Sequence, residues 1–125
     1  EMNRILADSG KALITGKNDN YNDQDIKALE AEEGARGKAH PNFFTDLSAL
    51  IANLEEFGFK LEMVRFFRYR GDFAKNIYEL EMPDKFYEYM LILEKTGCAK
   101  AGTRFEISSP YSKTYRRTRI SSRED

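Results

Sequence analysis

The sequence predicts an α+β fold in which a four-stranded antiparallel sheet, built from two hairpins, carries two helices on one face. Apolar residues at helical spacing in 43–57 and 84–96, strand-like segments after each, and turn residues between those segments support this prediction. The expected order is αββαββ, preceded by short N-terminal helices. We expect one domain overall, with its compact part in 42–125 and with helices and connectors in 1–41.

The N-terminal segment predicts two short helices. Apolar side chains at loosely helical spacing predict a helix over 2–14. That helix would be short or broken, because Gly10 costs about 1 kcal/mol relative to alanine in a helix interior. A surface helix is expected over 24–33, where Asn22 or Asp23 would cap the first turn and Gly34 would end the helix.

The compact part is expected to begin with a helix over 43–57 that ends at Gly58. Its apolar residues recur at steps of three and four, namely Phe43, Leu47, Leu50, Ile51, Leu54 and Phe57. The segments 60–69 and 74–82 are rich in aromatic and β-branched residues and are joined by Arg70-Gly71-Asp72. This pattern predicts a hairpin.

Alternation along the first strand of this hairpin predicts one mainly apolar face and one face of mixed basic and aromatic character. The first face would carry Leu61, Met63, Arg65, Phe67 and Tyr69, and the second Lys60, Glu62, Val64, Phe66, Arg68 and Arg70. Only the first face suits the packing of a helix layer.

A second helix is expected over 84–96, opened by Pro83-Asp84 and ended by Gly97. Its apolar side chains would occupy an arc of roughly 260° at 100° per residue. One sheet does not require so wide an apolar stripe. The surplus would pack on the N-terminal helices, or it would bind a partner or a second copy of the chain.

The last segments, 103–108 and 113–120, flank a Ser-Pro turn and predict a second hairpin. A shift of 39 residues then superposes Leu47 on Phe86 and Gly58 on Gly97, which suggests an internal repeat. The alternative is that any two amphipathic helices ending in glycine share these matches.

Composition narrows the class of protein. The chain has 125 residues with a net charge of −1, which gives no global field for nucleic acid or anionic membrane. Its single cysteine, Cys98, cannot form an internal disulfide, and no apolar run reaches membrane-spanning length. We therefore expect a cytoplasmic protein that has no membrane contact.

Catalytic and metal-binding motifs are not recognisable in the sequence. The only histidine, His40, lies in a connector, and nothing positions it with Cys98 and a third group. Asp19, Asp23 and Asp25 do not match the spacing of a calcium loop, and helix capping explains them better. We expect no enzymatic activity, no metal and no small-molecule cofactor.

The leading hypothesis is a small regulatory or interaction protein that contacts a protein partner, or itself, through the apolar helix 84–96 and the aromatic hairpin. Interface anchors are often aromatic residues or arginine. The expected partner-binding residues are Phe66, Tyr69, Arg70, Tyr87 and Leu91.

The alternative hypothesis is a nucleic-acid-binding domain, because residues 98–125 carry seven basic and three acidic side chains. Phosphate contacts would come from Arg65, Arg68, Arg70, Lys113, Arg116, Arg117 and Arg119, with stacking by Phe66 or Tyr115. Convergence of the arginines on one face would favour this hypothesis. Pairing with Glu79, Glu81 and Glu106 would favour an ordinary solvated surface.

Overall fold

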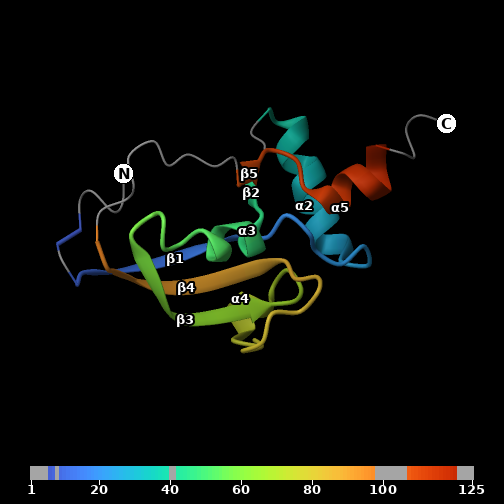
Figure 1. Cartoon of the computed structure of the whole chain (residues 1–125). Helices are drawn as coiled ribbons and strands as arrows, with labels where there is room; N and C mark the ends of the chain where they lie inside the picture. The colour runs from blue at the N-terminus through green and yellow to red at the C-terminus, as the bar shows by residue number, and fades with distance from the viewer. Residues whose placement is uncertain (1–5, 8, 40–41, 98–106, 121–125) are drawn as a thin grey trace.

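The computed structural model of the chain describes residues 6–7, 9–39, 42–97 and 107–120 (Figure 1). It is a mixed structure of helices and antiparallel sheets, but the strands form one sheet of three and one of two instead of a single sheet of four. In chain order the elements are β1 (Lys11–Lys17), α2 (Ile26–Gly37), β2 (Phe44–Thr45), α3 (Leu47–Ala52), β3 (Phe59–Phe67), α4 (Asp72–Lys75), β4 (Glu88–Lys95), β5 (Ser108–Ser109), α5 (Lys113–Tyr115) and the π-helical turn η1 (Arg116–Ile120).

The centre of the larger sheet is β4, which pairs antiparallel with β1 on one side and β3 on the other. The prediction of a helix over 84–96 is therefore wrong. Tyr89, Leu91 and Leu93 alternate with less buried residues along this strand, which is the period of a strand and not of a helix. The apolar arc was too wide for a helix because a central strand carries apolar side chains on both faces.

The prediction of a helix over 2–14 is also wrong where the structure describes it, since residues 11–17 form β1. Exposure alternates along β1, where Ile14 packs against the buried core residues, and Gly16 lies opposite Tyr89 in the ladder. A Cβ atom at Gly16 would lie 2.7 Å from Cζ of the Tyr89 ring, so this position suits glycine. Because β1 belongs to the same sheet as β3 and β4, the sheet crosses the expected boundary between 1–41 and 42–125.

Strand β3 is where it was expected, but its faces are not. A bulge shifts the register between Leu61 and Met63. Because a bulge adds one residue to one strand, Leu61 shares the core-facing side with Val64 and Phe66. The predicted assignment of these three residues to opposite faces is wrong.

Residues 74–82 do not form the second strand of the predicted hairpin. The chain turns at Gly71 (φ 102°), forms α4, and leaves it at Asn76 (φ 56°). Both residues adopt the left-handed conformation that glycine and asparagine tolerate best. Only Glu79 returns to β3, where it exchanges two backbone hydrogen bonds with Phe66 (3.0 and 2.8 Å).

The two other predicted helices are present with different limits. Asp25, and not Asn22 or Asp23, caps α2 by accepting the Ala28 N–H (3.2 Å), and the helix continues past Gly34. The expected helix over 43–57 is reduced to α3, because Phe44–Thr45 form β2 and turns follow Ala52. Gly58 adopts a positive φ of 80°, as expected of the residue that ends this helical region.

The C-terminal hairpin is not formed. Residues 113–120 are helical, with Ser112 as N-cap accepting the Tyr115 N–H (2.9 Å), while residues 98–106 lie outside the described residues. The burial of Thr114 and Tyr115 against the N-terminal half of the chain holds this segment in helical form. The internal repeat is wrong for the same reason, because its two halves would equate α3 with strand β4.

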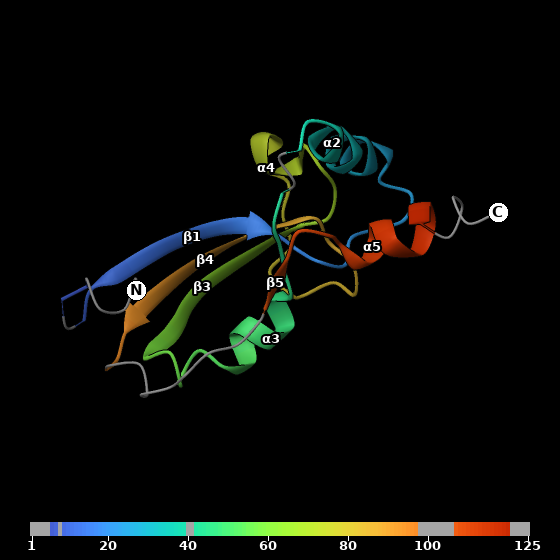
Figure 2. The same ribbon diagram turned by 90° about the horizontal axis from the view of Figure 1, so that it is seen from above.

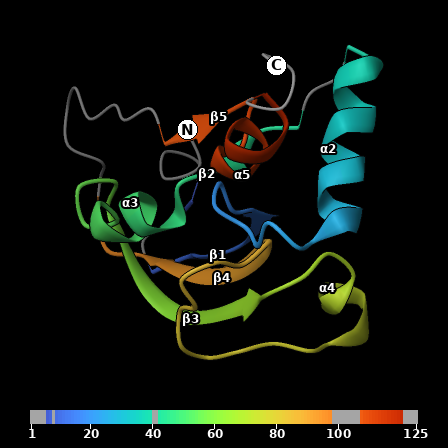
Figure 3. The same cartoon turned by 90° about the vertical axis from the view of Figure 1, so that its right-hand side faces the viewer.

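The buried apolar side chains form two cores. The first joins the sheet to α3 and contains Leu47, Leu54, Phe59, Phe66, Phe86, Tyr89, Leu91 and Leu93. The second joins α2, β2 and α5 beyond the end of the sheet and contains Tyr21, Ala28, Leu29, Phe44, Tyr87 and Tyr115. Figure 2 shows α3 beside β3, and Figure 3 shows α2 and α5 next to each other with α4 below them.

No helix in the described ranges is both long enough and apolar enough to cross a membrane.

Candidate functional site

The connection between β3 and β4, residues 68–87, exposes an unusual amount of apolar surface. Ten large apolar side chains are exposed among the described residues, and six of them belong to this one connection. We call these six the connection patch: Tyr69, Phe73, Ile77, Tyr78, Leu80 and Met82. Single exposed apolar residues are common, but several of them within one connection make this segment a candidate interaction surface.

Contacts with β3 hold two members of the connection patch, Phe73 and Tyr78, in place. The ring of Phe67 lies 5.0 Å from that of Phe73 and 6.4 Å from that of Tyr78, measured between centroids. The Arg65 guanidinium lies 4.4 Å from the centroid of the Tyr78 ring. The inner sides of these rings are therefore packed on the strand, whereas Phe73 and Tyr78 keep 42% and 38% of their surface exposed.

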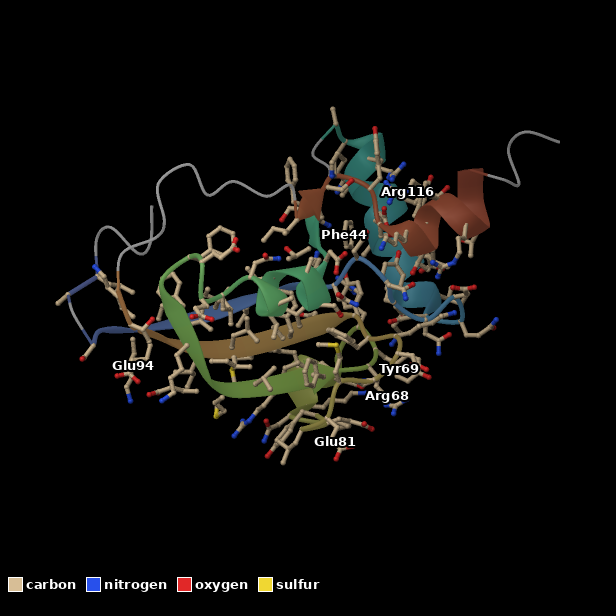
Figure 4. All side chains as sticks on the ribbon, in the orientation of Figure 1. Phe44, Arg68, Tyr69, Glu81, Glu94 and Arg116 are labelled. Atoms are coloured by element: carbon tan, nitrogen blue, oxygen red, sulfur yellow. The ribbon has the colours of Figure 1, made fainter. Side chains whose placement is uncertain are left out.

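A polar rim borders the connection patch. Arg68 donates two hydrogen bonds to the Glu79 carboxylate (2.8 and 3.1 Å), so the opposite charges of these two side chains offset each other. This pair lowers the pKa of Glu79 through the hydrogen bond from Arg68. Figure 4 shows Arg68, Tyr69 and Glu81 near one another, at the end of the sheet away from Glu94.

A cleft lies beside the connection patch, where the end of β1 and the start of β4 meet the turn before α4. Its lining consists of Lys17, Arg70, Gly71, Phe73, Ala74, Tyr87 and Glu88, and its volume is about 350 Å³. Lys17 and Glu88 are cross-strand neighbours on the sheet, and Arg70 reaches the cleft from the connection. We call this feature the Lys17/Arg70 cleft.

Three titratable groups in this cleft are destabilised in their charged forms. Burial lowers the pKa of Lys17, although the negative charge of Glu88 opposes this change, and the positive charge of Arg70 lowers the pKa further. Burial raises the pKa of the Glu88 carboxyl, and it raises the pKa of Tyr87 to about 12 although nearby Arg70 acts in the opposite direction. Ionisable groups whose charged form is disfavoured in the folded protein are typical of functional sites.

Glu88 gives a pH-dependent prediction. Because its pKa is higher in the folded chain than in the unfolded chain, protonated Glu88 favours folding, and this contribution is lost as the pH rises through the raised pKa. Glu88→Gln should therefore increase the free energy of unfolding at pH 7 and have little effect near pH 4. Urea denaturation at both pH values measures this difference. A variant that is less stable than the wild type at pH 7 would contradict the prediction.

The structure places the five expected partner-binding residues in two environments. Phe66, Tyr87 and Leu91 are 2%, 1% and 0% exposed, because they point from β3, β4 and the adjoining connection into the two cores. The structure therefore does not present these three side chains to a partner, and that part of the expectation needs correcting. Tyr69 and Arg70 are exposed at the start of the connection.

The residues expected to bind nucleic acid do not converge. Arg65 stacks on Tyr78, Arg68 pairs with Glu79, Lys113 lies between Asp19 (3.8 Å) and Asp46 (3.9 Å), and Arg117 pairs with Asp23 (2.9 Å). Tyr115 is buried, Arg116 is exposed on η1 (Figure 4), and the side chain of Arg119 lies outside the described residues, as does Glu106. The pairing with Glu79 is the arrangement expected of an ordinary surface.

The acidic residues near the start of α2 are also engaged. Asp25 is the helix cap, and its second oxygen accepts the backbone N–H of Arg70 (2.9 Å). The hydrogen bond from Arg117 lowers the pKa of Asp23. No group of metal-binding side chains is assembled within the described parts of the chain, while His40 and Cys98 lie outside them.

The buried carboxylate of Glu32 is the centre of a hydrogen-bond network that the sequence analysis did not predict. Its oxygens accept hydrogen bonds from the Tyr21 hydroxyl (2.7 Å), the Ser112 hydroxyl (2.6 Å) and N–H (3.1 Å), and Arg36 (3.1 Å). The Arg36 guanidinium lies 3.7 Å from the ring centroids of both Tyr111 and Tyr115. This network fastens α2 to the segment before α5. No local sequence signal identifies it, because its members lie far apart in the chain.

The fold and these surfaces define a class of protein, a small α+β domain whose β3–β4 connection presents both an apolar patch and a charged cleft. No protein-family model, curated protein or solved structure matches the chain.

Proposed function

We propose that this chain is a non-enzymatic interaction domain that binds a protein partner through the connection patch. The observation that carries the proposal is the exposure of six large apolar side chains within one connection. The class of function is the one expected from the sequence, but the contact surface is different. Of the expected surface, the helix 84–96 and the aromatic hairpin, the proposal keeps the exposed Tyr69 and leaves out Glu88–Lys95, which form a central strand.

The chemistry of the connection patch supports this proposal. Protein interfaces combine aromatic anchors at the centre with a polar rim. Phe73 and Tyr78 are already packed on Phe67, so their rings lose little freedom when a partner covers their outer sides. The Arg68–Glu79 pair supplies polar groups at the edge.

Nucleic-acid binding receives less support from the contacts. Arg68, Lys113 and Arg117 are each paired with carboxylates, which reduces the charge that they could offer to phosphates.

The test is affinity capture with a matched control. The immobilised wild-type chain, the variant Ile77→Ser/Leu80→Ser and the control Leu13→Ser are exposed to the same extract. Leu13 is 65% exposed on β1, so its replacement removes a similar apolar side chain elsewhere on the surface. We expect the specifically captured protein to fall about tenfold or more with the double variant, since central interface residues contribute at least that much.

The control should capture as much as the wild type. Equal capture by the double variant would contradict the proposal, and so would an equal loss with Leu13→Ser. Retained chemical-shift dispersion of both variants shows that they are folded.

A further inference from the structure

We propose that the Lys17/Arg70 cleft is a binding site for a carboxylate group. This inference concerns a site that shares only Phe73 with the connection patch, and it does not depend on the proposed partner.

Three segments that are distant in sequence assemble the cleft. Lys17 ends β1, Glu88 begins β4 directly opposite, and Arg70 precedes the turn at Gly71. The Arg70 main chain is fixed because its N–H donates to Asp25, the cap of α2 (2.9 Å). The Lys17 amino group lies 5.8 Å from the centroid of the Tyr87 ring. The main chains of Lys17 and Arg70 are thus fixed on two sides of one cleft.

The charges of Lys17 and Arg70 are only partly offset, because the Glu88 carboxyl group acts on both of them but forms no direct ion pair with either. Within the described residues, neither side chain forms an ion pair with a carboxylate, whereas six other basic residues do. Those six are Lys11, Arg36, Arg68, Lys85, Lys113 and Arg117. Burial lowers the pKa of Lys17, Glu88 partly opposes this change, and the like charge of Arg70 adds to the lowering. A bound anion would relieve this repulsion.

The charge balance favours an anion with a single charge. Lys17 and Arg70 face Glu88 across the cleft, and Asp25 lies nearby with its oxygens occupied by the N–H groups of Ala28 and Arg70. Because Glu88 and Asp25 together offset much of the charge of the two cations, a singly charged carboxylate is accommodated better than a phosphate dianion would be. The fork of a guanidinium and the point charge of an ammonium both suit carboxylate oxygens.

The remaining walls suit an acid with an apolar stem. Phe73, Ala74 and the ring of Tyr87 line the cleft next to the two cations. A carboxylate with an attached ring or chain would therefore place its apolar part on these side chains. The same chemistry occurs in a free organic acid and in an acidic side chain or C-terminus of a protein.

The test is a titration of the whole chain followed by ¹H–¹⁵N NMR, with benzoate as the probe. We expect saturable shifts of the Gly71 and Glu88 amide signals with benzoate, and much smaller shifts with uncharged benzamide or with phosphate. Arg70→Met and Lys17→Met should each weaken benzoate binding about tenfold or more, as expected for the loss of a charge-assisted hydrogen bond. Arg68→Met, which removes a neighbouring arginine outside the cleft, should leave it unchanged.

Three results would overturn the inference: no benzoate-dependent shift at these amides at concentrations well above the millimolar range, equal shifts with benzamide or phosphate, or equal effects of Arg70→Met and Arg68→Met. Capture of a partner by Arg70→Met then distinguishes the source of the carboxylate. A loss of capture indicates an acidic group on the partner, and unchanged capture indicates a free acid. Benzoate binding remains measurable even if the connection patch binds no protein, so the two proposals fail independently.

Discussion

Replacing Glu32 with alanine is expected to lower the free energy of unfolding by about 3–5 kcal/mol, the range found when one partner of a buried charged network is removed. Glu32 is 1% exposed, and its carboxylate accepts hydrogen bonds from Tyr21, Ser112 and Arg36. Alanine would leave these donors without an acceptor inside the second core. Burial and the hydrogen bond to Glu32 raise the pKa of Tyr21 far above its usual range, so its hydroxyl donates at every pH in normal use.

The matched control is Glu30→Ala, which removes an exposed carboxylate from the same helix. Its effect should stay within about 0.5 kcal/mol, the usual range for surface substitutions. Urea denaturation followed by circular dichroism measures both changes. A loss below about 1 kcal/mol for Glu32→Ala would show that the network does not fasten α2 to the C-terminal segment.

Replacing Leu91 with alanine should have an effect of similar size, about 2–5 kcal/mol, because a buried leucine loses both its transfer free energy and its packing. Leu91 is fully buried in the central strand, and its ladder neighbours are Ile14 on β1 and Val64 on β3. Truncation there opens a cavity beneath all three strands.

Leu13→Ala is the control for Leu91→Ala, because Leu13 belongs to the same sheet but is 65% exposed. We expect a loss of less than about 1 kcal/mol for this variant. Losses of equal size for the two variants would contradict the burial pattern of the three-stranded sheet. Both values come from the same urea denaturation measurement.

The sequence identified elements whose signals are local. Helix α2 and strand β3 were both predicted, because a capping acid, helical spacing and aromatic enrichment are contained within the segments themselves. Strand β4 was mistaken for a helix, because Pro83-Asp84 and Gly97 imitate helix ends and an apolar run of this length fits either structure. Only pairing with β1 and β3 decides between them, and that pairing depends on residues far away in the chain.

The candidate sites also separate into residues with a local sequence signal and residues brought together by distant segments. Tyr69 and Arg70 were recognised from their residue types and their turn, and both lie on the connection. The Lys17/Arg70 cleft could not be predicted, because Lys17 lies between the two helices expected in 1–41 and meets Arg70 only when β1 joins the sheet. Phe66 and Leu91 were expected at a surface for a related reason, since a bulge in β3 and a misassigned strand determine which way they point.

The most direct test of the proposed partner-binding surface is site-specific photo-crosslinking. A photoreactive phenylalanine derivative would replace Leu80 in the connection patch and, in a parallel sample, Leu13 on β1; both positions are exposed, at 69% and 65%. We predict that illumination in an extract gives a discrete adduct of higher mass from position 80 and not from position 13. The same adduct from both positions, or none from position 80, would contradict the assignment of the connection patch as the partner-binding surface.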